Sequence, residues 1–263
     1  MMNRRAFAAS VAAVSAALAL SATATRAEEA PASGAPPIRN VVLVHGLFAD
    51  GSSWGKVIPL LQRAGLNVTS VQNPLSSFQD DVAATRRALA LQDGPTVLVA
   101  HSYGGMVISE AGVDPKVAAL VYVAARAPDA GEDYGALAAK YPTPPASAGI
   151  VWGADGYGQL SEAAFVRDFA GDLPPEEARA YYAVQGRMSR ATPAARTTAA
   201  AWRSKPTWYA VSTEDRTINP DLERFMAHRM GANTIELPSS HVSLLSHPQE
   251  IAALIISAAY GKK

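Results

Sequence analysis

The stretch Thr96-Val-Leu-Val-Ala-His-Ser-Tyr-Gly-Gly105 decides how the rest of the chain is organised. It begins with a β-branched, apolar run, and residues 106–111 after it favour a helix. A strand that turns sharply into a helix holds one serine, here Ser102, at its C-terminal tip, with small residues two positions before and after. The pattern predicts a nucleophile elbow; the alternative is an ordinary strand-to-helix loop with an incidental serine. Ala100 replaces the usual glycine, and Gly104 and Gly105 keep the other side clear.

The N-terminal segment is typical of an export signal. Arg4 and Arg5 precede an apolar stretch of small residues that ends in small-residue cleavage sites, so residues 1–27 are predicted to be a signal peptide. The paired arginines fit either a twin-arginine signal or a plain secretory one. Residues 28–37 are rich in Pro, Ala and Gly and predict a flexible tail. We therefore expect an exported protein, periplasmic or secreted, without stable membrane anchoring.

Composition narrows the function classes. The chain has 263 residues with 23 basic and 23 acidic side chains, a balance that argues against nucleic acid as a partner. It contains no cysteine, which excludes disulfides and cysteine-based metal sites. Its length after removal of the signal fits one α/β domain with an insertion.

Apolar runs alternate with amphipathic segments along the chain. Six runs predict strands: 41–44, 66–71, 96–99, 117–123, 207–211 and 234–237. Helices are expected at 54–64, 78–91, 106–111, 220–230 and 248–259. This alternation predicts an α/β fold with about six mainly parallel strands flanked by helices.

One interval breaks the alternation. Residues 128–205, after the fourth strand, contain no convincing strand and several helical pieces, at 132–140, 162–169, 175–188 and 193–202. We expect a helical cap there, with residues 38–127 and 206–263 forming the core. The cap is rich in aromatic residues, most of which would fill its own small core. We expect Phe48, Trp152 and Val242 to line a substrate pocket.

A serine nucleophile needs a base and a carboxylate that orients the base. His241 follows the last strand, at the same sheet edge as Ser102, and is the best base. The other histidines are His45, after the first strand; His101, expected to point away from Ser102; His228, within a helix; and His247, at a helix start.

Acidic residues after the fifth strand supply the orienting carboxylate. Asp215 is the preferred residue, Glu214 the second choice and Asp129 the third, and a solvated loop charge is the alternative for each of them. The order Ser102, Asp215, His241 matches the order of one known fold.

An oxyanion formed during acyl transfer needs backbone donors. The N–H groups of Tyr103, after the elbow, and of Leu47, after the first strand, are in place to supply them. Gly46 allows close approach of the backbone, and His45 is expected to be structural, bonding across its loop.

Together these motifs resemble the α/β-hydrolase superfamily over nearly all of the chain after the signal. The resemblance rests on His45-Gly46, residues 50–54, residues 100–105, residues 212–215 and Ser240-His241. The layout looks most like the plant methyl-esterase and hydroxynitrile-lyase branch. Its lyases carry a lysine directly after the catalytic histidine, and Val242 stands there in this chain.

The resemblance implies an α/β-hydrolase fold and a serine esterase, and the aromatic residues of the cap argue for small substrates with an apolar or aromatic acyl or alcohol part. It implies no cofactor and no metal. A cofactor-free perhydrolase or C–C-bond hydrolase would use the same Ser-His-Asp triad, and a non-catalytic ligand binder would use the same fold. The sequence predicts neither the exact ester nor the oligomeric state.

Overall fold

The computed structural model describes residues 38–261. The predicted signal peptide, residues 1–27, and the predicted tail, residues 28–37, lie outside the described residues.

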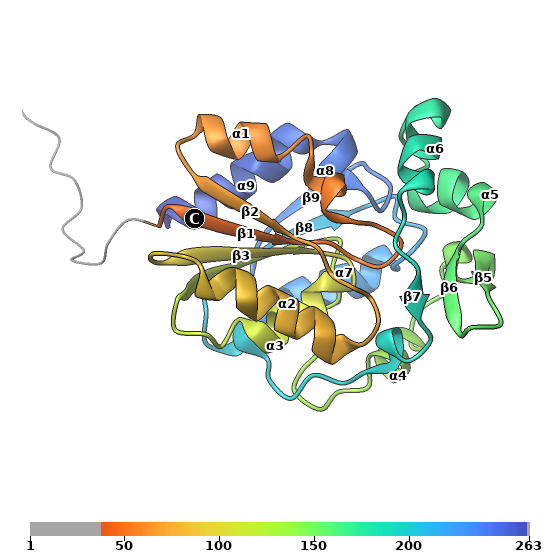
Figure 1. The fold of residues 1–263 in the computed structure, drawn as a ribbon, viewed down its shortest axis with the longest axis horizontal. Helices are drawn as coiled ribbons and strands as arrows, with labels where there is room; N and C mark the ends of the chain where they lie inside the picture. The colour runs from red at the N-terminus through yellow and green to blue at the C-terminus, as the bar shows by residue number, and fades with distance from the viewer. Residues whose placement is uncertain (1–37, 262–263) are drawn as a thin grey trace, which may run out of the picture. The chain divides into compact units, whose positions relative to one another are not determined.

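A parallel sheet of six strands forms the centre of the fold, in the order β2-β1-β3-β4-β8-β9 (Figure 1). Its strands are β1 (Asn40–Val44), β2 (Asn67–Val71), β3 (Thr96–His101), β4 (Val117–Val123), β8 (Thr207–Ser212) and β9 (Asn233–Leu237). Every pairing in the sheet is parallel. The predicted six-stranded α/β architecture is therefore confirmed.

Helices cover both faces of this sheet. They are α1 (Ile58–Arg63), α2 (Phe78–Ala90), α3 (Gly104–Ala111), α7 (Pro220–Met230), α8 (Ser243–Ser246) and α9 (Pro248–Tyr260). In Figure 1, α1 and α9 lie on one face, and α2 and α3 lie on the other. Both faces of β1 and β3 are buried, which explains why these strands are apolar without alternation.

Local signals in the sequence set the helix ends. The Ser77 side chain caps α2 by accepting the N–H of Asp80. Asn219 caps α7, Pro220 occupies the first turn, and Gly231 ends the helix at φ +60°. These helices consequently begin and end close to where the sequence places them.

The segment between β4 and β8, residues 128–205, is called the cap segment below. It contains α4 (Tyr134–Ala138), α5 (Glu162–Ala164), which continues as a π-helical turn over Phe165–Phe169, and α6 (Pro175–Ala183). It also contains strands β5 (Ile150–Trp152), β6 (Tyr157–Leu160) and β7 (Met188–Ser189), which form an antiparallel sheet.

Two expectations for the cap segment were wrong. We expected no strand there, yet Asp155-Gly156, with Gly156 at φ +80°, turns β5 back into β6; Asp-Gly is a known hairpin signal. We also expected a helix over 193–202. Instead, the N–H groups of Thr198 and Ala199 bond to the Glu110 carboxylate of α3, which holds this stretch extended between two short 3₁₀ turns.

Within residues 38–261, no helix combines the length and hydrophobicity that a membrane crossing requires.

Candidate active site

Ser102 lies on the turn between β3 and α3, in a conformation that few side chains adopt. Its φ is +55°, in the left-handed region. The turn is held on both sides, because the Ser102 N–H donates to the Val123 carbonyl (3.1 Å). The Ser102 carbonyl in turn accepts from the N–H groups of Gly105 and Arg126 (3.0 Å each). The sequence therefore folds here into the strained elbow that presents one hydroxyl at the sheet edge.

Glycines permit this tight approach. A Cβ at Gly104 would stand 2.8 Å from the His45 carbonyl oxygen, and a Cβ at Gly46 would stand 2.6 Å from the Ser102 Cβ. Both distances are too short for a real side chain. Gly104, predicted to keep the elbow clear, and Gly46, predicted to allow close approach of the backbone, are thus both required beside Ser102.

The structure brings Ser102, His241 and Asp215 into one hydrogen-bonded chain. His241 Nε2 lies 2.8 Å from Ser102 Oγ, and His241 Nδ1 lies 2.5 Å from Asp215 Oδ2. Because a carboxylate only accepts, Nδ1–H donates to Asp215, and Nε2 is left to accept the Ser102 hydroxyl. All three residues are buried. This tautomer is the one a general base needs.

Backbone donors orient the Asp215 carboxylate. Its Oδ1 accepts from the N–H groups of Thr217 (2.6 Å) and Ile218 (2.9 Å), which leaves Oδ2 directed at His241. The other two carboxylates considered for this role are elsewhere: Glu214 is exposed, and Asp129 forms an ion pair with Arg203.

The histidines other than His241 have separate positions. His45 accepts the Asn73 N–H at Nε2 (2.9 Å) and donates from Nδ1 to the Gly46 carbonyl (2.8 Å), as expected for a structural residue. His228 is exposed on α7, and His247 precedes α9, 3.8 Å from Glu250.

His101 has a role that the sequence did not reveal. Its Nε2–H donates to the backbone carbonyl of His241 (2.9 Å), and the two rings lie 4.6 Å apart. Burial, with a smaller contribution from His241, holds the pKa of His101 well below its usual value, so the ring is neutral. A neutral His101 therefore supports the His241 loop without adding charge beside the base.

Two backbone N–H groups near the Ser102 hydroxyl have no partner. Within residues 38–261, the amides of Leu47 and Tyr103 donate to no protein acceptor. The Tyr103 side chain is fixed by a hydrogen bond to Asp81 Oδ2 (2.8 Å) on α2. Fixed, unpaired N–H groups at this edge fit the oxyanion donors predicted from the sequence.

The cap segment anchors the loops that carry His241 and Asp215. Asp172 accepts the Ser240 N–H (2.9 Å) and hydroxyl (2.5 Å) with its two oxygens, directly before His241. The buried Asp168 accepts from Arg216 Nε (2.9 Å), directly after Asp215. Sequence reasoning missed both carboxylates, because no local pattern links them to loops about 50 to 70 residues away.

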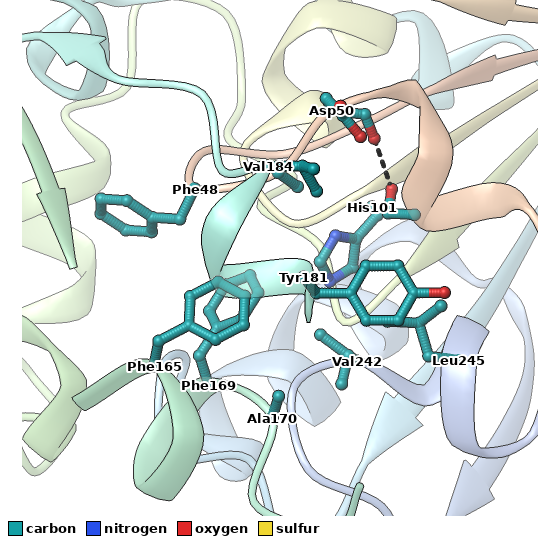
Figure 2. A pocket seen from close by; sticks show the side chains of 12 residues that line it. Phe48, Asp50, His101, Phe165, Phe169, Ala170, Tyr181, Val184, Val242 and Leu245 are labelled. Atoms are coloured by element: carbon teal, nitrogen blue, oxygen red, sulfur yellow. Dashed lines mark hydrogen bonds between the residues drawn. The ribbon is translucent and has the colours of Figure 1, made fainter. Parts of the chain in front are cut away.

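Two cavities flank these residues. The first is narrow and apolar, with about 10 Å³ of free volume, room for about one water molecule. Figure 2 shows His101, Val242, Phe165 and Phe169 around it. Phe169 lies between the others, its ring 5.0 Å from that of His241.

The second cavity, called the Trp152 cavity below, has a volume of about 140 Å³. The sheet edge contributes Leu47 and Phe48, and the cap segment contributes Trp152 and Met188. The three predicted pocket residues are thus divided: Trp152 lines this cavity, Val242 lines the narrow one, and Phe48 lines both.

The chain matches a protein-family model over most of its length. The model described as "Alpha/beta hydrolase family" matches residues 41–254. The chain belongs to the alpha/beta hydrolase family. Among curated proteins, this hydrolase is 32% identical to the carbendazim hydrolyzing esterase of Nocardioides sp. (strain SG-4G) over 130 residues. That match covers 43% of this chain and 53% of the relative, so it spans about half the relative's length.

Solved structures share the fold of this hydrolase at low sequence identity. Polyneuridine aldehyde esterase has a TM-score of 0.70 at 20% identity, over 84% of this chain and 98% of that one. A pyrethroid hydrolase from Sphingobium faniae JZ-2 has a TM-score of 0.71 at 23% identity, over 84% and 97%. A methylesterase from Arabidopsis has a TM-score of 0.68 at 18% identity, over 84% and 98%. The fold is therefore the one that these hydrolases share, and the predicted resemblance of the layout to the plant methylesterases is confirmed.

Among the described residues of this hydrolase, no group of three or more His, Asp or Glu side chains is arranged to hold a metal ion.

Proposed function

We propose that this hydrolase cleaves carboxylic esters of small apolar or aromatic compounds through an acyl-enzyme on Ser102. The observation that carries the proposal is the buried hydrogen-bonded chain from Ser102 through His241 to Asp215. A serine hydroxyl is a weak nucleophile at neutral pH, and this arrangement supplies its base and the orienting carboxylate.

In the first half-reaction, Ser102 Oγ attacks the ester carbonyl carbon while His241 Nε2 takes the hydroxyl proton. The carbonyl oxygen becomes an oxyanion, and the free N–H groups of Leu47 and Tyr103 stabilise it. The tetrahedral intermediate collapses when His241 gives its proton to the leaving alkoxide, which departs as the alcohol. The Asp215 carboxylate stabilises the imidazolium throughout.

In the second half-reaction, His241 takes a proton from water as the water oxygen attacks the carbonyl carbon of the acyl group bonded to Ser102 Oγ. Collapse returns the proton to Ser102 Oγ and releases the carboxylic acid. The protein needs no change of structure between the two halves, because the same base and the same donors act in both.

The substrate class rests on the lining of the cavities and on the printed names of similar proteins. Phe48, Trp152 and Met188 give the Trp152 cavity an apolar surface, which favours an apolar or aromatic group. The similar proteins are described as acting on carbendazim and pyrethroids, and as a polyneuridine aldehyde esterase. We extend from these only the class, esters of small organic molecules.

The test is hydrolysis of a p-nitrophenyl ester series of increasing acyl length by the wild type and by Ser102→Ala. We expect turnover with a preference for one acyl length, and a loss of about three or more orders of magnitude in the variant. Equal rates for the two proteins, with both folded, would contradict the proposal.

A further inference from the structure

Arg126 is a cation whose backbone adjoins the turn that carries Ser102. It follows β4, and its backbone N–H donates to the Ser102 carbonyl (3.0 Å). Within residues 38–261, no Asp or Glu forms an ion pair with its guanidinium. Its Nε is buried and has no hydrogen-bond partner there, and its Nη1 reaches only the Pro193 carbonyl (3.4 Å) and Met106 Sδ (3.9 Å).

The guanidinium is held in place and borders two cavities. It stacks on the Tyr134 ring, 4.6 Å from the centroid. It lines the Trp152 cavity and also a third cavity, of about 310 Å³, beside α4. Ser147 and Thr217 border both of these cavities. Thr217 also donates to Asp215, so this region adjoins the catalytic chain directly. A half-buried guanidinium without an anion is costly unless a ligand supplies an acceptor.

We propose that Arg126 binds an anionic group, a carboxylate above all, on an ester whose apolar part occupies the Trp152 cavity. This inference rests on the proposed esterase function and makes it narrower. It assigns the substrate as an ester with a free acid, carried on either the acyl or the alcohol part. The planar guanidinium suits a carboxylate through paired N–H···O bonds.

The test compares matched anionic and neutral esters. One arm uses the mono-p-nitrophenyl ester of glutaric acid against p-nitrophenyl pentanoate, and the other uses the benzoate ester of glycolic acid against ethyl benzoate. In at least one arm, we expect the wild type to prefer the anion. Arg126→Met should lower that preference by about tenfold or more, and Arg126→Lys by less.

Activity on the neutral esters separates the two failures. If Ser102-dependent hydrolysis of neutral esters is present but Arg126→Met leaves the anion preference unchanged in both arms, the Arg126 inference is wrong and the esterase function stands. If neither ester class shows Ser102-dependent hydrolysis, the esterase function itself fails.

A separate observation concerns Glu223, a buried carboxyl that the catalytic chain above does not include. Glu223 lies on α7 and is 0% exposed. One of its oxygens, Oε2, accepts the Ser212 N–H (3.1 Å) at the end of β8. The other, Oε1, meets no N–H or O–H donor within residues 38–261. The Ser212 carbonyl in turn accepts the Asp215 N–H (3.2 Å), so Glu223 and Asp215 both contact the residue that ends β8, and the charge of Asp215 acts on the Glu223 carboxyl.

Two adjacent buried carboxyl groups cannot both carry a charge at low cost. Asp215 accepts three donors, from His241, Thr217 and Ile218, and these favour its ionised form. Glu223 accepts only one. The proton of the pair therefore belongs on Glu223, whose O–H then donates to Asp215.

We infer that Glu223 is a positioning residue, a neutral carboxylic acid whose O–H holds the Asp215 carboxylate in line with His241. Burial, followed by the charge of Asp215, raises the pKa of Glu223 well above its usual range. The other groups around it are the phenols of Tyr209, on β8, and Tyr134, on α4, and the guanidinium of Arg224, the cation whose charge acts against this shift. Glu223 thus remains neutral where carboxyl groups are normally ionised.

Two substitutions test this role. Glu223→Gln keeps a donor toward Asp215 and an acceptor for the Ser212 N–H. Glu223→Leu keeps a side chain of similar volume but no hydrogen-bonding group. We expect Glu223→Gln to retain kcat within about threefold, and Glu223→Leu to lose about tenfold or more in kcat with little change in KM. Equal kcat in Glu223→Leu and wild type would overturn the inference.

The pH profile supplies a readout that a merely structural role would not change. On the alkaline side, ionisation of Glu223 removes its O–H and places a second charge beside Asp215, so wild-type kcat/KM should decline before that of Glu223→Gln. If instead the wild-type profile has a step on the acid side that Glu223→Gln lacks, Glu223 is ionised at neutral pH and the inference fails. This comparison holds even if Glu223→Leu does not fold.

Discussion

The sheet edge and the cap segment contribute to the same site in different ways. The sheet edge supplies Ser102, Asp215 and His241, each buried and held by short hydrogen bonds. The cap segment supplies side chains that line the two neighbouring cavities, such as Trp152 and Phe169. Ion pairs within the cap segment, such as Asp155–Arg187 and Asp133–Arg196, are exposed and contribute little to stability.

The difference separates the residues expected to carry out the reaction from the residues expected to select the substrate. A reaction needs fixed atoms, so its groups lie at the ends of strands whose positions the whole sheet determines. Selection needs shape and apolar surface, which the cap segment provides. The exceptions are Asp168 and Asp172, because through them the cap segment also holds the loops that carry Asp215 and His241.

The largest effect should follow from a change at the sheet edge. Asp215→Asn leaves a carboxamide whose NH₂ can bond to His241 Nδ1, and this favours the tautomer in which Nε2 carries the proton and cannot accept from Ser102. We expect kcat to fall by about three to four orders of magnitude. Glu214→Gln is the matched control, since Glu214 is exposed one position earlier, and should keep wild-type kcat. A strong loss in the control instead would assign the acid to Glu214.

A smaller effect should follow from removing the Asp172 side chain, which joins the cap segment to the loop that carries His241. Asp172→Ala removes both acceptors of Ser240 and frees the loop that carries His241. We expect kcat to fall by about tenfold to a hundredfold, because small displacements of a base are costly. Asp155→Ala, which removes an exposed ion pair with Arg187 and a bond to the Tyr157 N–H in the β5–β6 turn but no contact to the His241 loop, should leave kcat unchanged. If both variants behave alike, the cap segment does not position the base.

Much of the sheet edge was predictable from the sequence, and less of the cap segment was predictable. Ser102 was found because the strand, the turn and the helix are contiguous, and His241 and Asp215 because each follows a strand of the parallel sheet. His101, Asp172 and Glu223 were missed because their roles depend on tertiary contacts between segments far apart in the chain. The short strands β5–β7 were missed because only Asp155-Gly156 indicated a turn.

A change confined to the cap segment should alter selection more than chemistry. Trp152→Ala enlarges the Trp152 cavity and removes apolar surface from it. We expect kcat/KM for the preferred acyl chain to fall by about tenfold, mainly through KM, and the preferred chain to lengthen. Val151→Ala, at a position that is 56% exposed, is the control and should keep the wild-type ranking. An equal loss of kcat for every ester would contradict a role in selection.

The smallest effect concerns the stability of the contact between Asp81 on α2 and the Tyr103 side chain. Burial raises the pKa of Asp81, the partner of Tyr103, to about 6. Hydrogen bonds from Ser76 and Ser77 lower the pKa of its neighbour Asp80. Asp81 therefore stabilises the fold most in acid, and this contribution is lost as pH rises from about 4 to 6. The contribution of Asp80 has the opposite sign and is lost as pH falls.

Urea unfolding of the Asn variants at pH 4 and pH 7 measures this difference. Relative to the wild type, Asp81→Asn should gain unfolding free energy between pH 4 and pH 7. Asp80→Asn should lose only a little unfolding free energy over the same interval, because Asp80, whose pKa is lowered, titrates mainly below pH 4. Parallel behaviour of the two variants would show that burial does not distinguish the two carboxyl groups.

The most direct test of the central claim is intact-mass and peptide analysis after reaction with an aryl fluorophosphonate, which forms a stable adduct with an activated serine. We expect one adduct per chain, located on Ser102, absent from Ser102→Ala and formed much more slowly by His241→Ala. Modification of another residue, or no modification of a protein that hydrolyses esters, would contradict that claim.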